Sequence, residues 1–492
     1  MPVERTATKN RPSKRASRVS RTCYRALKAR DARFDGRFFV AVSSTRSYCR
    51  PVCTVKPPKR ENCRFFPSAA AAESNGYRPC LRCRPESAPG TPLRARSALV
   101  AAALRLIENG LLDRASVADL AARIGVGERH LRRLFVAEIG AGPLEIAATR
   151  RLLFAKKLLG ETSLPITQIG LASGYGSLRR FNSAFRTGYG RSPRALRRTR
   201  VDVAAGALTL RLSYRAPYDF AALLAFFARR ASPGVETVDA ASYSRRFALG
   251  GEAGSLRVTQ IAGANALALT IAFPHSAPLQ DISARVRRMF DLDADIGAIN
   301  TRLGADQKLR ALIRRHPGQR LPGGWDGFEI AIRAVLGQQI SVAAARTLAQ
   351  RLVERYGTHV AADDGARVQL FPAPQTLAQA DLTGIGLTRQ RAATLGAVAR
   401  AVCDGAVSFR PEQTLDEFVA SWTELPGIGA WTAHYIAMRA LSEPDAFPAA
   451  DLVLRKAVAG DGEAVSTAAL ERMAENWRPW RAYAVLHLWR SA

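Results

Sequence analysis

The sequence predicts a multidomain protein that combines a small α/β domain, an all-α domain, a small α+β domain and a second all-α domain. Three observations lead to this fold class. The chain has 492 residues, against roughly 150 for a typical domain. Six of its seven cysteines fall within residues 23–83. The spacing of apolar residues changes at about residues 204 and 285. The predicted parts are a basic flexible tail at 1–20 and domains at 21–88, 95–199, 204–285 and 286–492.

Charge is unevenly distributed along the chain. The formal net charge is +32, of which +28 falls in residues 1–200 and +4 in the remainder. Such a basic block is typical of a protein that binds a polyanion, and we expect nucleic acid. The alternative is a solvated arginine-rich surface. No apolar run reaches the roughly 18 residues needed to cross a bilayer. We therefore expect a cytoplasmic, nucleoid-associated monomer rather than a membrane or secreted protein.

Two close cysteine pairs stand out in the first domain. Cys49 and Cys53 form one pair, Cys80 and Cys83 form the other, and 26 residues separate the pairs. Each short spacing can place two thiolates on the same ion, so the pairs predict one tetrahedral zinc site. In a reducing compartment we expect a metal rather than disulfides. On spacing alone, the zinc could be a purely structural clip.

The residues around these pairs are more specific than their spacing. Residues 35–42 read DGRFFVAV, residues 48–53 read YCRPVC, and residues 76–85 read GYRPCLRCRP. Over about residues 20–86 these strings resemble the zinc domain of the Ada family of adaptive-response proteins, although Tyr48 and Tyr77 replace phenylalanines that are usual there. The resemblance implies that Cys49 irreversibly accepts a methyl group from a DNA methylphosphotriester. It also implies a zinc ion held by Cys49, Cys53, Cys80 and Cys83.

The charge of such a cluster suggests how methyl transfer could switch DNA binding. Four thiolates around one divalent cation carry a net charge of about −2. The metal keeps Cys49 deprotonated at neutral pH, and the surplus negative charge leaves its thiolate nucleophilic. Methylation reduces the charge to about −1, so DNA phosphates are repelled less. Cys23 and Cys63 have no place in this pattern and are predicted to be non-ligands, the alternative being that Cys63 substitutes for one of the four. The alternative hypothesis is that the zinc region is only a DNA-binding ribbon and does not accept a methyl group.

Residues 97–198 have the apolar spacing of amphipathic helices. Residues 116–135 and 165–185 each read as a helix-turn-helix unit, and the string GYGRSP at 188–193 closes the second. Over about residues 95–199 these tandem units resemble the DNA-binding domain of AraC-type transcriptional activators. Together with the preceding domain, they imply a methylation-triggered activator whose partners are a promoter operator and RNA polymerase. The expected DNA-contacting side chains, some of which could touch only phosphates, are Arg129, Arg132, Arg133, Arg179 and Arg180.

The segment from 204 to 285 has a different pattern of apolar residues. Alternating apolar runs at 208–212 and 267–273 predict strands, and residues 219–229 predict a helix between them. The segment has no cluster of acids, histidines or cysteines that suggests catalysis. We therefore expect a small α+β domain in a supporting role.

Residues 425–437 read LPGIGAWTAHYIA. A Pro-Gly-x-Gly turn that opens a helix presents backbone N–H groups where a phosphate can bind, although a single such turn could be an ordinary connector. Downstream, residues 447–452 read FPAADL and place Asp451 24 residues after Gly427. The turn and this acid are therefore candidates for one nucleic-acid site.

Further strings extend this pattern. Residues 334–341 read AVLGQQIS and residues 477–489 read WRPWRAYAVLHLW. Over about residues 204–492 the chain resembles the AlkA-like alkylpurine branch of the helix-hairpin-helix DNA glycosylases. That resemblance implies that Asp451 is the catalytic carboxylate, that Gly427 and Gly429 bind a phosphate, and that Gln339 stands where the branch has its leucine wedge. It also assigns the base cleft to Trp431, Tyr435, Trp489 and Leu452, the last replacing a tyrosine.

The implied reaction is monofunctional hydrolysis of the N-glycosidic bond of alkylated purines. Such bases are cationic and leave readily, so the enzyme flips the nucleotide and stabilises the positive sugar with a carboxylate. We expect no cofactor for this step, because neither a metal nor a lysine nucleophile is required. The competing hypothesis is a transcription factor whose C-terminal half is an inactive DNA clamp.

Several other residues are predicted to be structural. His434 is expected on a helix face, Trp477 and Trp480 in the core, and Cys403 as a buried small hydrophobe. The sequence contains no Pro-Cys-His-Arg string. The alkylguanine-transferase half of full-length Ada proteins is therefore expected to be absent.

Overall fold

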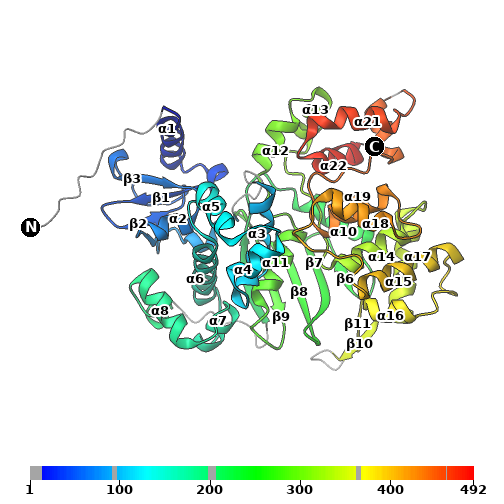
Figure 1. The fold of residues 1–492 in the computed structure, drawn as a ribbon, viewed down its shortest axis with the longest axis horizontal. Coiled ribbons are helices and arrows are strands. Elements are labelled where there is room, and N and C mark those ends of the chain that lie inside the picture. Colours follow the sequence, from blue (N-terminus) through cyan, green and yellow to red (C-terminus); the bar gives the residue numbers. More distant parts are fainter. Residues whose placement is uncertain (1–13, 91–96, 198–206, 362–366, 461, 492) are drawn as a thin grey trace, which may run out of the picture.

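The computed structural model describes residues 14–90, 97–197, 207–361, 367–460 and 462–491 (Figure 1). The predicted flexible tail is wrong over residues 14–20. Helix α1 spans Lys14–Lys28, so residues 14–20 are helical, while residues 1–13 lie outside the described chain. Its C-terminal turns contribute Cys23, Ala26 and Leu27 to a small buried cluster with Phe38 and Val40. This apolar face explains why the basic segment folds as a helix rather than remaining a tail.

The first domain is a four-stranded sheet with order β3-β1-β2-β4. Its strands are β1 (Phe39–Val42), β2 (Ser47–Cys49), β3 (Cys63–Phe66) and β4 (Arg78–Pro79). Strand β1 pairs antiparallel with β2 and β3, and β4 pairs parallel with β2. Helix α2 (Ala69–Ser74) buries four alanines. The small α/β domain expected from the sequence is confirmed.

The second domain contains the two expected helix-turn-helix units. Helix α3 (Ala98–Glu108) precedes α4 (Val117–Arg123) and α5 (Glu128–Ile139), and α6 (Pro143–Glu161) leads to α7 (Ile166–Ala172), α8 (Leu178–Tyr189) and α9 (Pro193–Leu196). Helix α4 starts at a capping box in which Ser116 and Asp119 bond each other's backbone N–H groups. The tandem arrangement predicted from helical periodicity is therefore present.

The third domain is an antiparallel sheet with strand order β5-β9-β8-β7-β6. Its elements are β5 (Ala207–Ser213), α10 (Phe220–Arg230), β6 (Glu236–Val238), β7 (Ser242–Leu249), β8 (Glu252–Gln260) and β9 (Ala266–Ala272). The next helix, α11 (Leu279–Met289), belongs to the same core, since Ile282, Val286 and Met289 pack with the sheet residues. The structural unit thus continues beyond the predicted boundary at 285.

The last domain consists mainly of helices, with a central cluster in which Trp422 is fully buried. The helices are α12 (Ile296–Leu303), α13 (Gln307–Arg315), α14 (Gly327–Leu336), α15 (Val342–Tyr356), α16 (Pro374–Gln379), α17 (Arg389–Cys403), α18 (Leu415–Thr423), α19 (Ala430–Ala440), α20 (Leu452–Ala459), α21 (Thr467–Ala474) and α22 (Arg481–Ser491). The all-α prediction missed one hairpin, β10 (Thr358–Ala361) with β11 (Arg367–Leu370). Cys403 is exposed, which corrects its prediction as a buried residue, because it occupies the outer face of the last turn of α17.

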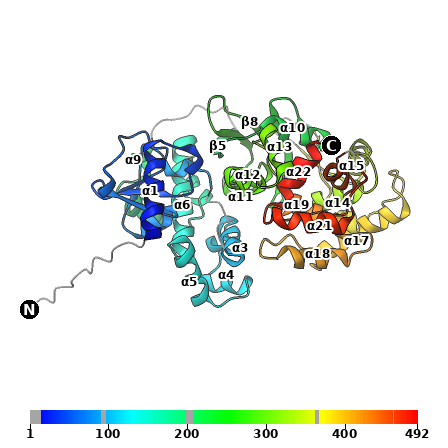
Figure 2. The ribbon, with the colours of Figure 1, turned by 90° about the horizontal axis from the view of Figure 1, so that it is seen from above.

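The second and third domains share a core. Leu158 of α6, Ile169 of α7 and Phe181 of α8 lie in the same buried cluster as Leu210 and Leu267 of the sheet, whereas the first helix-turn-helix unit has a cluster of its own. Figure 2 shows the zinc and helix-turn-helix elements on one side and the remaining domains on the other. The shared core means that the predicted boundary near residue 200 separates sequence motifs but not independent folding units.

Candidate functional site

A cleft of about 790 Å³ lies between α10 of the sheet domain and helices α14, α15, α19 and α22. Trp431, Tyr435, Asp451 and Trp489 all line it. Three segments far apart in the sequence therefore meet around one space, as the glycosylase resemblance implied. Val453 also lines the cleft, whereas Leu452 does not and has an exposed fraction of 53%.

The position of Leu452 departs from its predicted place in the base cleft. Asp451 is the N-cap of α20 and Leu452 is its first residue. Successive residues of a helix point about 100° apart. Leu452 therefore points in a different direction from Asp451, and its side chain is mostly exposed and lies outside the cleft lining.

Asp451 is held by three donors. Its Oδ2 accepts from Trp431 Nε1 at 2.9 Å, and its Oδ1 accepts from Trp489 Nε1 at 3.3 Å and from Leu454 N at 2.9 Å. The two indoles and the N-cap bond fix the orientation of the carboxylate. The side chain is half-buried at the cleft wall, so the structure presents a preorganised negative group to anything bound there.

Aromatic faces form the adjoining wall. Trp431 and Tyr435 are four residues apart on α19 and therefore stack, with ring centroids at 5.4 Å and an interplanar angle of 7°. Trp489 lies 6.3 Å from Tyr435 at 48°. Phe226 of α10 also lines the cleft, and the sequence reading missed it because it comes from another domain. Such faces suit a flat, electron-poor base.

The cleft also contains arginines that the sequence reading did not identify. Arg439 Nη1 donates to Tyr435 Oη at 2.9 Å, and Arg230 and Arg333 line the same space. Burial opposes ionisation of Tyr435, but the charges of these arginines outweigh it and lower the pKa of its hydroxyl to about 8. Arg439 follows Tyr435 by one helical turn, so its spacing could have revealed it.

The Pro-Gly-x-Gly turn connects α18 to α19. Gly427 has a φ of +83°, and a Cβ at that position would lie 2.2 Å from Thr394 Oγ1, so glycine is required. Gly429 is the N-cap of α19 and supplies no side-chain cap. Gln338 Nε2 donates to Gly427 O at 2.9 Å, which ties the α14–α15 loop to the turn. The neighbouring Gln339 is exposed and has a φ of +57°.

The remaining C-terminal predictions concern structural residues. His434 Nδ1 accepts from Phe447 N at 3.3 Å, and burial lowers the pKa of this histidine to about 4. It is therefore neutral at physiological pH and lies on a packed helix face, as predicted. Trp477 is buried and Trp480 packs against the same core. Neither lines the cleft.

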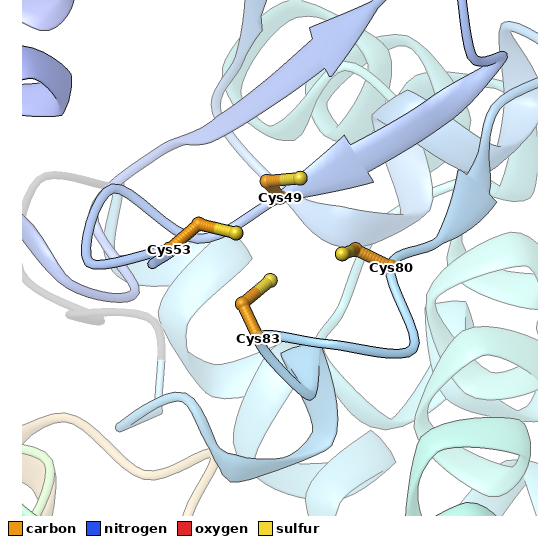
Figure 3. A group of neighbouring side chains, drawn as sticks. All are labelled: Cys49, Cys53, Cys80 and Cys83. Atoms are coloured by element: carbon orange, nitrogen blue, oxygen red, sulfur yellow. The ribbon is translucent and has the colours of Figure 1, made fainter. Parts of the chain in front are cut away.

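The four cysteines predicted to bind zinc come together in the first domain (Figure 3). Their Sγ atoms all lie within 4.8 Å of one another. Cys49 ends β2, Cys53 follows it by one turn, and Cys80 and Cys83 follow β4, which pairs with β2. Hydrogen bonding to the neighbouring Cys49 thiol lowers the pKa of Cys53 below its ordinary value. Four converging thiols with this spacing fit one tetrahedral zinc ion.

Other residues complete the surroundings of the cysteine cluster. Arg50 N donates to Cys83 Sγ at 3.4 Å, and the Arg50 guanidinium pairs with Asp35. Cys23 and Cys63 are buried in a separate apolar cluster outside the four-cysteine group. Their predicted exclusion from the ligand set is therefore consistent with the geometry.

The predicted DNA-contacting arginines lie on the second helix of each helix-turn-helix unit, and all of them are exposed: Arg129, Arg132, Arg133, Arg179 and Arg180. The apolar residues of these helices, including Leu131 and Phe181, are fully buried. Each helix therefore turns a basic face to solvent. In the described part of the chain, no helix is both long and apolar enough to cross a membrane.

A comparison with known proteins finds a relative that matches this chain over nearly its whole length. The chain is 41% identical over 474 residues, 95% of both chains, to the "Probable bifunctional transcriptional activator/DNA repair enzyme AlkA" of Mycobacterium tuberculosis. The chain belongs to this family of bifunctional activator and repair proteins. Within the family arrangement, its C-terminal part is 34% identical over 281 residues to DNA-3-methyladenine glycosylase 2 of Escherichia coli, covering 56% of this chain and 95% of that protein.

Family models match the four predicted kinds of domain in the predicted order, although the match to the third extends to residue 326, past the predicted boundary at 285. They match the metal binding domain of Ada at 22–86, a helix-turn-helix domain at 120–199, the AlkA N-terminal domain at 209–326, and the HhH-GPD superfamily base excision DNA repair protein at 332–482. The fold of the last two resembles a 3-methyladenine DNA-glycosylase from Archaeoglobus fulgidus, with a TM-score of 0.50, 23% identity and coverage of 57% of this chain and 96% of that chain. The predicted family relationships are confirmed.

Proposed function

We propose that the C-terminal half is a DNA glycosylase that releases alkylated purines such as 3-methyladenine, and that the N-terminal half couples damage sensing to transcription. The single observation that carries the glycosylase proposal is Asp451. Its carboxylate is oriented by two indole N–H groups at the wall of an aromatic cleft, close to a phosphate-binding type of turn. The intact carboxylate favours an enzyme over an inactive DNA clamp.

The reaction assigns a role to each group in the cleft. The flipped base lies against the aromatic faces while the turn at Gly427 and Gly429 holds a backbone phosphate. As the bond from C1′ to the base nitrogen breaks, the electron pair leaves with the base and positive charge builds on the sugar. Asp451 stabilises that charge and orients the water whose oxygen bonds to C1′, and its carboxylate accepts the proton that the water loses. Gln339 is exposed near the turn and fills the vacated stack.

Replacement of Asp451 by asparagine tests the assignment. Asparagine can still cap α20, but it has one acceptor oxygen where aspartate has two, so one N–H donor loses its partner. We therefore expect a stability loss of about 1 to 3 kcal/mol and normal affinity for DNA. Loss of the negative charge should lower single-turnover release of 3-methyladenine by about a thousandfold. Asp306→Asn is a matched control, because Asp306 is the N-cap of α13 and accepts from Trp477 Nε1 at 3.0 Å away from the cleft. Near-normal release by Asp451→Asn refutes the proposal.

In the N-terminal half, Cys49 is the proposed methyl acceptor. Its thiolate attacks the methyl carbon of a DNA phosphotriester, an S–C bond forms, the C–O bond breaks, and the phosphate leaves as a diester anion. A zinc ion held by the four cysteines would keep the thiolates deprotonated at neutral pH. Peptide mass spectrometry of wild-type protein after exposure to methylated DNA should find one methyl group, on Cys49. A methyl group found on Cys53, Cys80 or Cys83 instead would overturn the assignment. Cys63→Ala is the control, and this variant should accept the methyl group as wild type does.

The helix-turn-helix domain supports a role as a transcriptional activator. Its exposed basic helices suit an operator in double-stranded DNA, and the family includes proteins named as bifunctional activators. We extend the proposal to RNA polymerase as the partner, to a monomer, and to a cytoplasmic, nucleoid-associated location. A footprint on promoter DNA that appears only after methylation of Cys49 is the expected result. A footprint of equal strength without methylation would refute the proposal that methylation of Cys49 switches on DNA binding.

A further inference from the structure

The wall of the base cleft contains a buried cation without a carboxylate partner. Arg439 has an exposed fraction of 4%. Its Nε donates to Pro322 O at 2.5 Å, its Nη2 to Gly323 O at 3.3 Å, and its Nη1 to Tyr435 Oη at 2.9 Å. Within the described ranges Arg439 forms no ion pair. A buried guanidinium normally pairs with a carboxylate because its desolvation is expensive.

A neighbouring arginine of the same cleft shows the usual arrangement. Arg333 pairs with Glu236 at 2.9 Å and with Glu329 at 2.7 Å, so its charge is neutralised. The charge of Arg439 is not neutralised in this way. Its guanidinium group lies against the aromatic surface, with the guanidinium carbon 4.7 Å from the centroid of the Phe226 ring. Arg230 lies on the same ring at 3.9 Å. The inner wall of the cleft is therefore positive when Tyr435 is a neutral phenol.

A positive wall conflicts with the cationic substrates of the proposed function. Two like charges about 6 Å apart in a partly buried site repel appreciably, so a protonated or alkylated base gains less from the aromatic faces. A neutral damaged purine is not repelled, and its ring carbonyl can accept from a cationic donor. If Tyr435 loses its proton, the charges of the phenolate and Arg439 cancel, and the electron-rich ring attracts a cationic base.

We propose that Tyr435 and Arg439 form a charge-setting pair that decides whether the cleft favours cationic alkylpurines or neutral damaged purines. The inference rests on the proposed glycosylase function and deepens it. Tyr435 touches the base, and Arg439 is a positioning residue that acts through it. In the phenol form the pair favours neutral bases, and in the phenolate form it favours cationic bases.

The charged groups around Tyr435 support this assignment. Arg439 on its own helix, Arg230 on α10 and Arg333 on α14 face it, and Asp451 lies beyond Trp431. The arginines lower the pKa of the Tyr435 hydroxyl to about 8 despite its burial. The two forms of the pair therefore interconvert close to physiological pH.

The test compares single-turnover excision of 3-methyladenine, which stays cationic over this range, and of neutral hypoxanthine from otherwise identical duplexes between about pH 6.5 and 8.5, at saturating enzyme. For wild type we expect the ratio of cationic to neutral base release to rise by about tenfold as pH passes through about 8. Uncatalysed release at each pH is subtracted. Parallel profiles for the two bases overturn the inference while leaving the glycosylase function standing. Release of neither base overturns the proposed function and the inference with it.

Variants separate the charge of the pair from its structural role. Tyr435→Phe should abolish the pH dependence of the ratio and hold it at the low-pH value. Arg439→Lys should retain the dependence, whereas Arg439→Gln should move its midpoint toward higher pH. Ultraviolet difference titration should detect one tyrosinate forming near pH 8 in wild type but not in Tyr435→Phe. Tyr218→Phe is the control, because burial raises the pKa of Tyr218 well above its ordinary value. Persistence of that tyrosinate signal in Tyr435→Phe overturns the assignment.

Discussion

Replacement of Arg215 by methionine should loosen the junction between the zinc domain and the glycosylase half. Arg215 is 2% exposed. Its guanidinium donates to Asp35 O of the zinc domain at 2.9 Å, to Asp293 O at 2.9 Å, and to Gly90 O. Burial lowers the pKa of Arg215 to about 10, so it remains charged at neutral pH. Methionine retains most of the apolar stem but removes every donor.

The expected magnitude follows from these contacts. Hydrogen bonds from a charged donor contribute roughly 1.5 kcal/mol or more each, about 4.5 kcal/mol for this set. Because methionine carries no charge, the variant avoids the cost of burying the guanidinium, which offsets about 1 to 2 kcal/mol of this loss. The net loss of docking free energy is therefore about 3 kcal/mol, which corresponds to roughly a hundredfold increase in the open fraction.

Hydrogen–deuterium exchange measures this opening directly. Amides of residues 35–42 and 287–295 should exchange about a hundredfold faster in Arg215→Met, while those of α17 and α19 keep their wild-type rates. Arg285→Met is the matched control, because Arg285 lies on α11 and pairs with Asp281 without contacting the zinc domain. Unchanged exchange at the junction, or an equal increase with both substitutions, would show that Arg215 does not hold the domains together.

Further expectations concern the hairpin, the buried histidines and the helix-turn-helix surface. Gly427→Ala should weaken binding to a duplex with an abasic site by about 1 to 3 kcal/mol, because its positive φ and the contact with Thr394 both oppose a Cβ; unchanged affinity would contradict this. Burial lowers the pKa values of His434 and His487 to about 4 from 6.5. The unfolded chain then binds more protons, so unfolding free energy should fall as pH drops from about 6.5 to 4, and His434→Gln should reduce that slope. In titrations with undamaged DNA, Arg179→Ala should lower the salt dependence by about one counterion, and an unchanged slope would place this side chain off the phosphates.

Local patterns were enough to predict much of the site. Trp431 and Tyr435 are one helical turn apart, so their stacking follows from helical periodicity once α19 forms. The short cysteine spacings likewise fixed which thiols could converge. Leu452 was misplaced because the resemblance aligned its position but not its direction from the first turn of α20. Cys403 was misplaced because apolar neighbours do not determine which face of a helix is buried.

Contacts between distant segments could not be predicted in the same way. Phe226 and Arg230 reach the cleft only because α10 of the sheet domain packs against α15, and no spacing in the sequence encodes that approach. The fusion of the second helix-turn-helix unit with the sheet core is another example. Both segments read as amphipathic, but nothing local states that their apolar faces meet.

The sequence by itself determined the order of the modules, the four converging cysteines and the placement of Asp451 after the Pro-Gly-x-Gly turn, because each depends on short spacings along the chain. Only the tertiary structure decided the charge of the base cleft and the junction at Arg215. Arg439 at the cleft and Arg215 at the junction are each buried and donate to backbone carbonyl groups of segments remote in the sequence. Such long-range burial sets the electrostatic environment, and the environment determines how the same side chain behaves.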